Sequence, residues 1–280
     1  MAEITAAVVG QLREMTNAGM MECKKALVEA KGDINGAVDI LRKKGVATAA
    51  KKAMRQAKDG LIAQSIQPGA RIGVLVEVNC ETDFVAKNDS FRAFSEEVAR
   101  TLAADPKADL EAQRAAQVAK IGENIKISRF ERFEVGGNGA VAAYIHTGAK
   151  VGVLVEVAAG KEASVQTEAF KQLVKDITLQ IAAANPVSVS RDQVPADIIS
   201  KEREIAMEQV KNKPAQVVEK IVTGKLDKYY QTVCLLEQGF VKQNGEVTVK
   251  EHVAAVAKEL GDELTIRRFV RFQVGESFAG

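Results

Sequence analysis

The hexapeptide GVLVEV occurs twice in the chain without change, at residues 73–78 and again at residues 152–157. A second pair of matching stretches follows in the same order: RFERFEVG at 129–136 and RFVRFQVG at 268–275. One repeated hexapeptide can arise by chance, but two matched pairs in the same order indicate a duplicated unit. The middle and the end of the chain are therefore predicted to be two copies of one fold.

Each copy is predicted to contain strands that flank a helix. Apolar residues alternate through IGVLVEV, which is typical of a strand with one apolar face, and the preceding Pro-Gly pair favours a hairpin turn. Asp89 or Ser90 is expected to cap the next helix. Antiparallel sheets packed against helices predict an α+β core. The expected core positions are Phe91, Phe94, Val98 and Leu102 on the helix, and Ile125, Ile127, Phe133 and Val135 in the closing strand.

The second copy contains an insertion. Gly73 and Arg129 lie 56 positions apart, whereas Gly152 and Arg268 lie 116 apart, so 60 additional residues separate the landmarks of the second copy. The stretch from about 186 to 240 contains two helical patterns joined by a short link at 211–213, which predicts an antiparallel helical hairpin. A stabilising excursion and a partner-binding arm are both open roles for it. The expected apolar seam comprises Ile198, Ile205, Val218, Ile221 and Val222.

The N-terminal third is predicted to be a separate three-helix unit. TNAGM and KGD are good helix breaks, and the expected inward positions are Ile4, Val8, Leu12 and Met15, then Cys23, Ala26, Leu27 and Ala30, then Ile34, Val38 and Leu41. The predicted division is a three-helix domain at 1–45, a basic helical linker at 46–59, a first core subdomain at 60–139 and a second core subdomain at 140–280.

Composition excludes several classes of protein. The chain has 280 residues, 46% of them hydrophobic, and a formal net charge of +2, which lacks the basic excess of a dedicated nucleic-acid binder. No segment approaches the roughly 18 consecutive apolar residues of a membrane span. The first residues lack the pattern of a secretory signal. A cytoplasmic location, without membrane or specific nucleic-acid binding, is therefore expected.

The sequence offers little for an enzyme. Three widely spaced cysteines and two histidines form no zinc or disulfide pattern, and no GxxxxGK[ST] phosphate loop is present. Cys80 with Asp83 and Lys87 has no general base nearby in the sequence. We therefore expect no catalytic residue, no metal site and no cofactor.

Phe84 is unusual because turns between a strand and a helix are normally polar. It lies in NCETDFVAKN, residues 79–88, directly after the first GVLVEV strand. The second copy has KEASVQT at 161–167, aligned with residues 82–88 of the first copy, and no aromatic residue. The fold therefore has no general need for a phenylalanine here. The alternative is that Phe84, seven residues before Phe91, extends the core stripe of one continuous helix.

Met20 and Met21 form a second candidate contact. Adjacent residues on a helix point about 100° apart, so both can hardly enter one small core. At least one of the two is expected to be exposed, where a flexible thioether suits protein contact. Core packing of both is the alternative.

Five stretches, in order and spacing, resemble the bacterial elongation factor Ts family, the guanine-nucleotide exchange factors of elongation factor Tu: MTNAGMMECKKAL, NCETDFVAKN, KIGENI, YIHTGAKVGVLVEV and VCLLEQGFVK. The resemblance covers essentially the whole chain. It implies a ubiquitin-associated-like N-terminal domain, two related core subdomains, and a hairpin that serves in homodimerisation. Only ESFAG follows RFQVG, so contacts of the C-terminal helical module found in some relatives are not expected.

The resemblance also implies how the protein acts. TDFV would press into the nucleotide-binding domain of elongation factor Tu, displace its magnesium ion and disturb phosphate binding, with Phe84 as a wedge between partner helices. The chain would bind no nucleotide itself. The implied partner-binding residues are Thr82, Asp83, Phe84 and Val85, with further contacts from Met20 and Met21, from Ile121 and Gly122, and more weakly from His146.

Three other functions are distinguishable from nucleotide exchange. A peptide-binding adaptor would need only residues 1–55 and not Phe84. An RNA-binding translation factor using KKAMRQAK, residues 51–58, would bind RNA with steep salt dependence. An enzyme would show turnover without a partner. The combined motifs favour the exchange factor.

Overall fold

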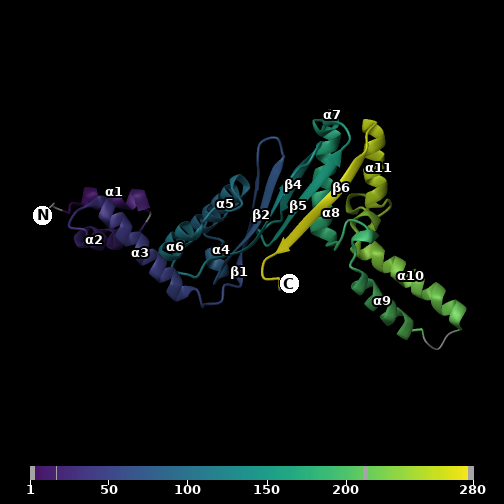
Figure 1. Cartoon of the computed structure of the whole chain (residues 1–280), viewed down its shortest axis with the longest axis horizontal. Helices are drawn as coiled ribbons and strands as arrows, with labels where there is room; N and C mark the ends of the chain where they lie inside the picture. The colour runs from purple at the N-terminus through teal and green to yellow at the C-terminus, as the bar shows by residue number, and fades with distance from the viewer. Residues whose placement is uncertain (1–3, 17, 211–213, 277–280) are drawn as a thin grey trace.

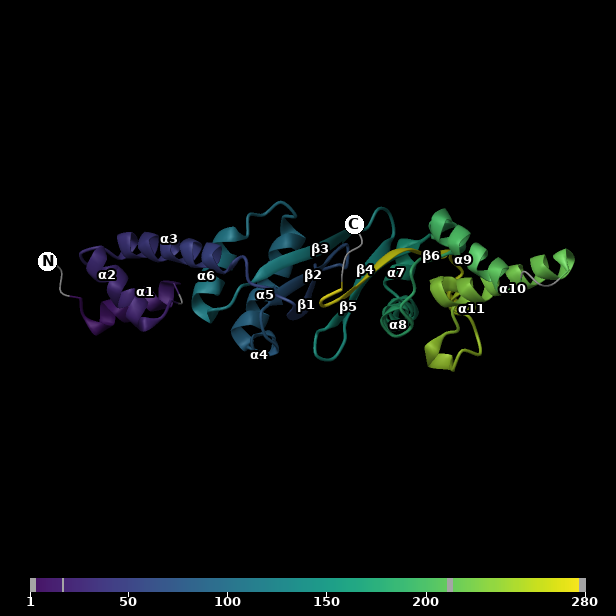
Figure 2. The same cartoon turned by 90° about the horizontal axis from the view of Figure 1, so that it is seen from below.

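The computed structural model describes residues 4–16, 18–210 and 214–276. These residues form an elongated molecule in which a three-helix unit lies at one end, two small sheets with their helices lie in the middle, and a helical hairpin projects at the other end (Figures 1 and 2).

The N-terminal unit consists of α1 (Ala6–Thr16), α2 (Met20–Glu29) and α3 (Ile34–Lys52). Asp33 caps α3 by accepting hydrogen bonds from the amides of Asn35 and Gly36 at 3.2 and 2.9 Å. Met15 was expected to face inward but is 57% exposed. α3 continues without interruption to Lys52, so its last turns extend into the segment predicted as a linker. The buried residues of the unit are Val9, Leu12, Cys23, Ala26, Leu27 and Ala37.

Two three-stranded antiparallel sheets form the centre, as predicted for an α+β core. The first contains β1 (Asp59–Ile66), β2 (Ile72–Cys80) and β3 (Lys126–Glu134), and the second contains β4 (Gly139–Ile145), β5 (Val151–Ala159) and β6 (Leu264–Gln273). The GVLVEV strand is the central strand of each sheet. Both sheets also have a register shift at the same point, after Glu77 and after Glu156. The duplication predicted from the sequence is therefore present in the backbone.

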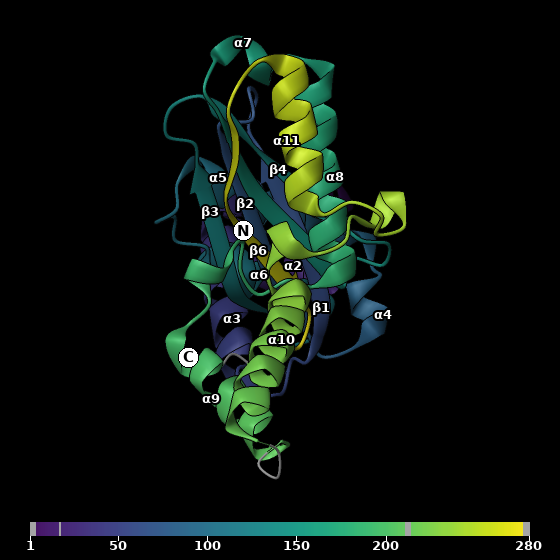
Figure 3. The same ribbon diagram turned by 90° about the vertical axis from the view of Figure 1, so that its right-hand side faces the viewer.

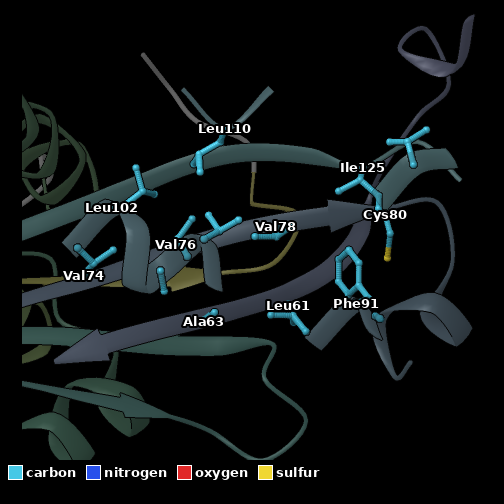
Figure 4. Packing of buried hydrophobic residues seen from close by; sticks show 14 of the residues in the cluster. Leu61, Ala63, Val74, Val76, Val78, Cys80, Phe91, Leu102, Leu110 and Ile125 are labelled. Carbon is cyan, nitrogen blue, oxygen red and sulfur yellow. The ribbon is translucent and has the colours of Figure 1, made fainter. Parts of the chain in front are cut away.

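Helices cover the outer face of each sheet. α4 (Asp83–Ala86), α5 (Asp89–Ala104) and α6 (Glu111–Ile121) belong to the first copy, and α7 (Glu162–Val165), α8 (Glu168–Ala184) and α11 (Val249–Leu260) to the second. Figure 4 shows the first core, where Phe91 lies beside the side chains of β1 and β2. The cap of α5 is Asn88, which accepts from the Ser90 amide at 2.9 Å, and the prediction of Asp89 or Ser90 was therefore wrong by one or two positions.

The inner faces of the two sheets pack together through Ile62, Leu75, Phe133, Val135, Val141, Leu154 and Phe272. Two reciprocal backbone hydrogen bonds join the copies: the Ile62 amide donates to the Ala149 carbonyl at 2.7 Å, and the Val141 amide donates to the Ala70 carbonyl at 2.8 Å. The order of layers is helices, sheet, sheet, helices, and α8 and α11 lie side by side on the second sheet (Figure 3). Each strand-to-helix turn therefore lies beside the hairpin turn of the other copy.

The hairpin comprises α9 (Ala196–Glu208) and α10 (Ala215–Val233), and short 3-10 turns connect it to the core at Arg191–Gln193, Leu235–Glu237 and Val241–Gln243. Ala206, Val210 and Val222 form its buried seam. Ile205 was expected in this seam but is 51% exposed, because its neighbour Ala206 faces α10 instead. The predicted link at 211–213 lies outside the described residues.

Candidate partner-binding site

TDFV supplies the N-cap residue and the first three residues of a one-turn helix, α4, which follows the carboxyl end of β2. Thr82 is the N-cap residue, with an extended backbone, and its hydroxyl oxygen accepts from the Val85 amide at 3.4 Å. Ala86 is buried and Val85 is half-buried against the first core. Because these residues anchor the inner side of the turn, the residue before them is directed outward.

That residue is Phe84, whose side chain is 81% exposed. The alternative of a continuous helix with Phe84 on its core stripe is wrong, because α4 ends at Ala86 and α5 begins anew after the Asn88 cap. Burying a phenylalanine side chain stabilises a folded protein by about 2 kcal/mol, and the fold forgoes this stabilisation at Phe84. On this ordered turn the ring is accessible to another molecule.

Asp83 precedes Phe84 and is paired with Lys87 on the surface. Its Oδ2 is 2.7 Å from Lys87 Nζ, and both side chains are about half exposed or more. The hydrogen bond with Asp83 raises the pKa of Lys87. Such a surface pair contributes little to stability, so the carboxylate is available for a different partner.

Glu123 holds the turn from behind and was missed at the sequence level. Its carboxylate accepts from the amides of Glu81 and Thr82 at 3.0 and 3.1 Å and from the Thr82 hydroxyl at 2.7 Å. The amide of Asn124 donates in return to Glu81 Oε1 at 2.6 Å. The available signal was KIGENI, in which only Ile121 and Gly122 were singled out.

Ile121 and Gly122 lie in the same loop as Glu123. Ile121 ends α6 and packs partly against the first core. Gly122 caps that helix with φ of 88°, a left-handed conformation that glycine adopts readily, and its carbonyl accepts from Lys52 Nζ. The loop therefore contacts both α4 and the end of α3.

His146 is exposed in the β4–β5 turn, where the Tyr144 hydroxyl lies 3.0 Å from its Nδ1. This turn is at the α4 end of the core, because Lys150 pairs with Asp59, and Asp59 is the register partner of Cys80. Burial raises the pKa of Asp59, but the hydrogen bonds from Lys150 and the Gly60 amide outweigh it and lower the pKa overall, with help from Lys87. The charges that act on Asp59 thus come from both the β4–β5 turn and α4.

Met20 and Met21 begin α2 and are 49% and 63% exposed, so the alternative that both pack in the core is wrong. The structure does not bring them next to Phe84. α2 lies at the end of the molecule and α4 on the central core (Figures 1 and 2). A partner that touches both must therefore be large.

Covalent chemistry has no support at this site. Cys80 is buried, its thiol donates to the Thr82 carbonyl at 3.1 Å, and burial, followed by the charges of Glu123 and Asp59, raises its pKa to about 12. The thiol is therefore protonated at neutral pH and a poor nucleophile. Across the described ranges no group of three or more His, Cys, Asp or Glu side chains is placed to hold a metal ion. What the turn presents is an exposed phenylalanine on a turn fixed by hydrogen bonds.

Comparison with known proteins decides the family. The family model described as "Elongation factor TS" matches residues 81–276. Proteins named elongation factor Ts from Nautilia profundicola, Symbiobacterium thermophilum and Clostridioides difficile are 46%, 47% and 47% identical, over 99% of this chain and 94%, 93% and 94% of their own lengths. The chain belongs to the elongation factor Ts family.

Membership in the elongation factor Ts family makes the protein a translation elongation factor. The matched region of the family model begins at Glu81, directly before TDFV, and includes α4, α5, α6 and β3 of the first copy, the second copy and the inserted hairpin. The alignments with the full-length relatives extend over the N-terminal helices as well. Within the described part of the chain, none of the helices is long and apolar enough to cross a bilayer.

Proposed function

We propose that this translation elongation factor binds elongation factor Tu in its GDP-bound form and promotes release of GDP, so that GTP can bind. The observation that carries the proposal is the 81% exposure of Phe84 on an ordered turn at the edge of the core. A flat aromatic side chain presented in this way suits insertion between elements of a partner. The chain itself would bind no nucleotide, metal or cofactor and would catalyse no reaction.

In the proposed complex, Thr82, Asp83, Phe84 and Val85 press against the nucleotide-binding domain of the partner. Phe84 wedges between partner helices, and Asp83 exchanges its exposed contact with Lys87 for one with the partner. The insertion of Phe84 shifts the partner helices, and this shift displaces the magnesium ion that holds the phosphates of GDP in the partner. Each 1.4 kcal/mol of unfavourable coupling weakens GDP binding about tenfold.

Energetics support a role without catalytic side chains. A buried aromatic anchor contributes about 2 kcal/mol or more at an interface. Coupling between two ligands of one protein is reciprocal. If this factor weakens the binding of GDP to the partner, GDP weakens the binding of this factor by the same ratio. Binding of GTP to the empty partner then expels the factor and completes the cycle.

Additional contacts with the partner are proposed in two places, one close to Phe84 and one in the N-terminal unit. Ile121, Gly122 and His146 lie at the same end of the core as α4 and would extend its interface. Met20 and Met21 would hold the distant N-terminal unit on the same large partner, which suits their exposure. We propose that the chain is divided into four structural units, at residues 1–45, 46–59, 60–139 and 140–280.

The test is stopped-flow release of fluorescent GDP from elongation factor Tu. We expect the wild type to accelerate release and Phe84→Ala to lose at least about tenfold of that acceleration with its folding intact, since an anchor of about 2 kcal/mol is removed. The matched control is Ala163→Phe, which places a phenylalanine on the equivalent exposed turn of the second copy. Retained exchange in Phe84→Ala, or loss of exchange in Ala163→Phe, contradicts the role assigned to Phe84.

The hairpin is proposed as a homodimer contact. Ile205, Met207 and Val217 are 51%, 44% and 43% exposed on it, which is unusual for a hairpin that only braces the core. Sedimentation equilibrium of the wild type and of Ile205→Asp tests this role, since a charge in the contact should shift a dimer towards monomer. A wild type that is monomeric at all concentrations favours the bracing role.

A further inference from the structure

α4 is too short to hold its own orientation. A helix of one turn has an unfavourable nucleus and gains almost nothing from propagation, so it depends on tertiary contacts. Val85 and Ala86 supply an apolar anchor on one side only. Polar contacts must therefore fix the direction in which Phe84 points.

Glu123 supplies those contacts from a distant part of the chain. Two amides and one hydroxyl from residues 81 and 82 converge on its carboxylate at 2.7–3.1 Å. Hydrogen bonds to an ionised acceptor are stronger than those between neutral groups. Because the Thr82 hydroxyl donates to Glu123, its oxygen lone pair is left facing the Val85 amide, so the same carboxylate also orients the helix cap.

A comparison with the second copy distinguishes contacts that are common to the fold from contacts that are specific to the turn with Phe84. Asp262 occupies the position of Glu123, with the spacing of 139 residues that relates Arg129 to Arg268, and it accepts from the Lys161 amide at 3.0 Å. Lys161 replaces Thr82 and, among the described residues, makes no side-chain cap for α7. Ala163 stands in the position of Phe84. The carboxylate-to-amide contact is thus common to both copies. In the first copy the carboxylate also accepts from the hydroxyl of the N-cap residue Thr82, whereas in the second copy the side-chain hydrogen bond of Asp262 comes from Ser164 within α7.

We propose that Glu123 is a positioning residue for nucleotide exchange: it fixes the orientation of α4 and so directs the Phe84 ring at the partner. This inference rests on the proposed function. Glu123 touches neither the nucleotide nor its magnesium ion, and it acts through Thr82 and the backbone of the turn. Its neighbour Asn124 holds the segment directly after α3, since Asn124 Nδ2 donates to the Arg55 carbonyl at 2.8 Å.

The test compares Glu123→Gln with Asp262→Asn in the GDP-release assay, with the full-length protein titrated to saturation. The glutamine side chain would keep the size of the original glutamate, but its NH2 group would face a donor. We expect the maximal release rate of Glu123→Gln to fall about tenfold, because misplacement of a positioned group by a fraction of an ångström has effects of this size. The half-saturating concentration should change much less, since the other contacts remain. Asp262→Asn should match the wild type.

Two further measurements distinguish positioning from a general loss of stability. In a Phe84→Ala background, Glu123→Gln should add less than about twofold, because both changes act through one ring. Amide hydrogen exchange of residues 82–86 in the free protein should speed up in Glu123→Gln and stay unchanged in Asp262→Asn.

The outcomes separate the two proposals. If Phe84→Ala slows release and Glu123→Gln does not, or if the two effects multiply, the positioning role is wrong and the proposed function stands. Equal slowing by Asp262→Asn also overturns it, because the effect would then belong to the fold. If the wild type itself fails to accelerate release, the proposed function fails and this inference fails with it.

Discussion

The turn after β2 and the turn after β5 occupy equivalent places in the two copies of the core, yet they present different surfaces. Both are one-turn helices held by an acidic residue from the segment before the closing strand. The first exposes Phe84 and is capped by a threonine, while the second exposes Ala163. The duplicated backbone therefore provides the platform, and side chains at a few surface positions provide the proposed function.

Features buried in the platform are the same in both copies. Glu77 and Glu156 are each 2% exposed and pair with Arg129 and Arg268 at 2.7 Å. The arginine of each copy also stacks over a phenylalanine of the other copy: Arg129 lies 4.0 Å from the Phe272 ring, and Arg268 lies 4.2 Å from the Phe133 ring. The repeated motifs GVLVEV and RFxRFxVG thus specify the same pair of contacts in both directions between the two sheets, and each set is called an arginine clasp.

The largest effect is expected where the copies are most alike. Gly60 and Gly139 have φ of +144° and +150°, and an added Cβ would lie 2.2 Å from the Val78 carbonyl oxygen and 2.5 Å from that of Val157. Alanine at either position should lower the free energy of unfolding by about 3 kcal/mol or more, through strain and displacement of backbone. Urea unfolding followed by circular dichroism measures both variants.

Gly224→Ala is the control for these two changes. Gly224 lies within α10, and nothing in the described structure comes within 4 Å of a Cβ built there. Alanine should therefore stabilise the helix by about 0.5–1 kcal/mol. A cost at Gly139 that is far smaller than at Gly60 would mean that the second copy tolerates a shift of its first strand, and the two platforms would then differ in rigidity.

The arginine clasps should respond unequally. In Arg129→Ala, the donors that remain to Glu77 within the described residues are neutral, from Asn79 Nδ2 and the Gly275 amide. In Arg268→Ala, Glu156 keeps a charged partner in Arg267 at 3.3 Å. Removing one member of a buried ion pair costs about 3 kcal/mol when the other charge is left uncompensated. We expect about this loss for Arg129→Ala and roughly half for Arg268→Ala, measured by urea unfolding. Equal losses would indicate that Arg267 does not compensate Glu156.

The caps of the two short helices differ, and this difference gives a smaller effect. Thr82→Ala removes both the cap of α4 and the hydroxyl bond to Glu123, and it should lower the free energy of unfolding by about 1 kcal/mol. Lys161→Ala removes no side-chain cap and should change it by less than about 0.5 kcal/mol. Thermal unfolding of both variants checks the comparison. A cost at Lys161 equal to that at Thr82 would show that the two turns are held in the same way.

Periodic patterns predicted most of the fold because they reflect burial. The alternation in GVLVEV and the helical spacing from Phe91 to Leu102 follow directly from packing against a sheet, and the repeat located the insertion. Errors occurred where the prediction had to choose between two adjacent residues. Ala206, not Ile205, is buried in the hairpin, and Asn88, not Asp89, caps α5. Such choices depend on the rotation of a helix and on local backbone geometry, which periodicity does not specify.

The candidate site was only partly accessible to the same reasoning. Phe84 was identifiable because its counterpart in the second copy is not aromatic. Glu123 was not, because it lies 41 positions from Thr82 in the sequence and acts through hydrogen bonds to backbone amides, which the motif KIGENI does not by itself reveal. The proximity of the β4–β5 turn to α4 likewise follows from how the two sheets face each other.

The smallest expected effect concerns pH and is confined to the second copy. His252 of α11 stacks on Phe240 with ring centroids 4.2 Å apart, and its Nε2 lies 3.7 Å from Asp176 Oδ2 of α8, next to Lys242. Burial lowers the pKa of His252, an effect that Asp176 opposes and Lys242 reinforces. The counterpart in the first copy, by the same spacing of 139, is Gln113, which is exposed and does not titrate.

Because the folded state lowers this pKa, the unfolded chain takes up the proton first as the pH falls. The contribution to stability is therefore complete above about pH 6.5, the ordinary pKa of histidine, and is lost progressively below it, with a limiting slope of about 1.4 kcal/mol per pH unit. The free energy of unfolding should fall less between pH 7 and pH 5.5 in His252→Gln than in the wild type. An identical decrease in both proteins would assign the acid sensitivity to carboxylates shared by the two copies, and the second copy would no longer differ from the first in this respect.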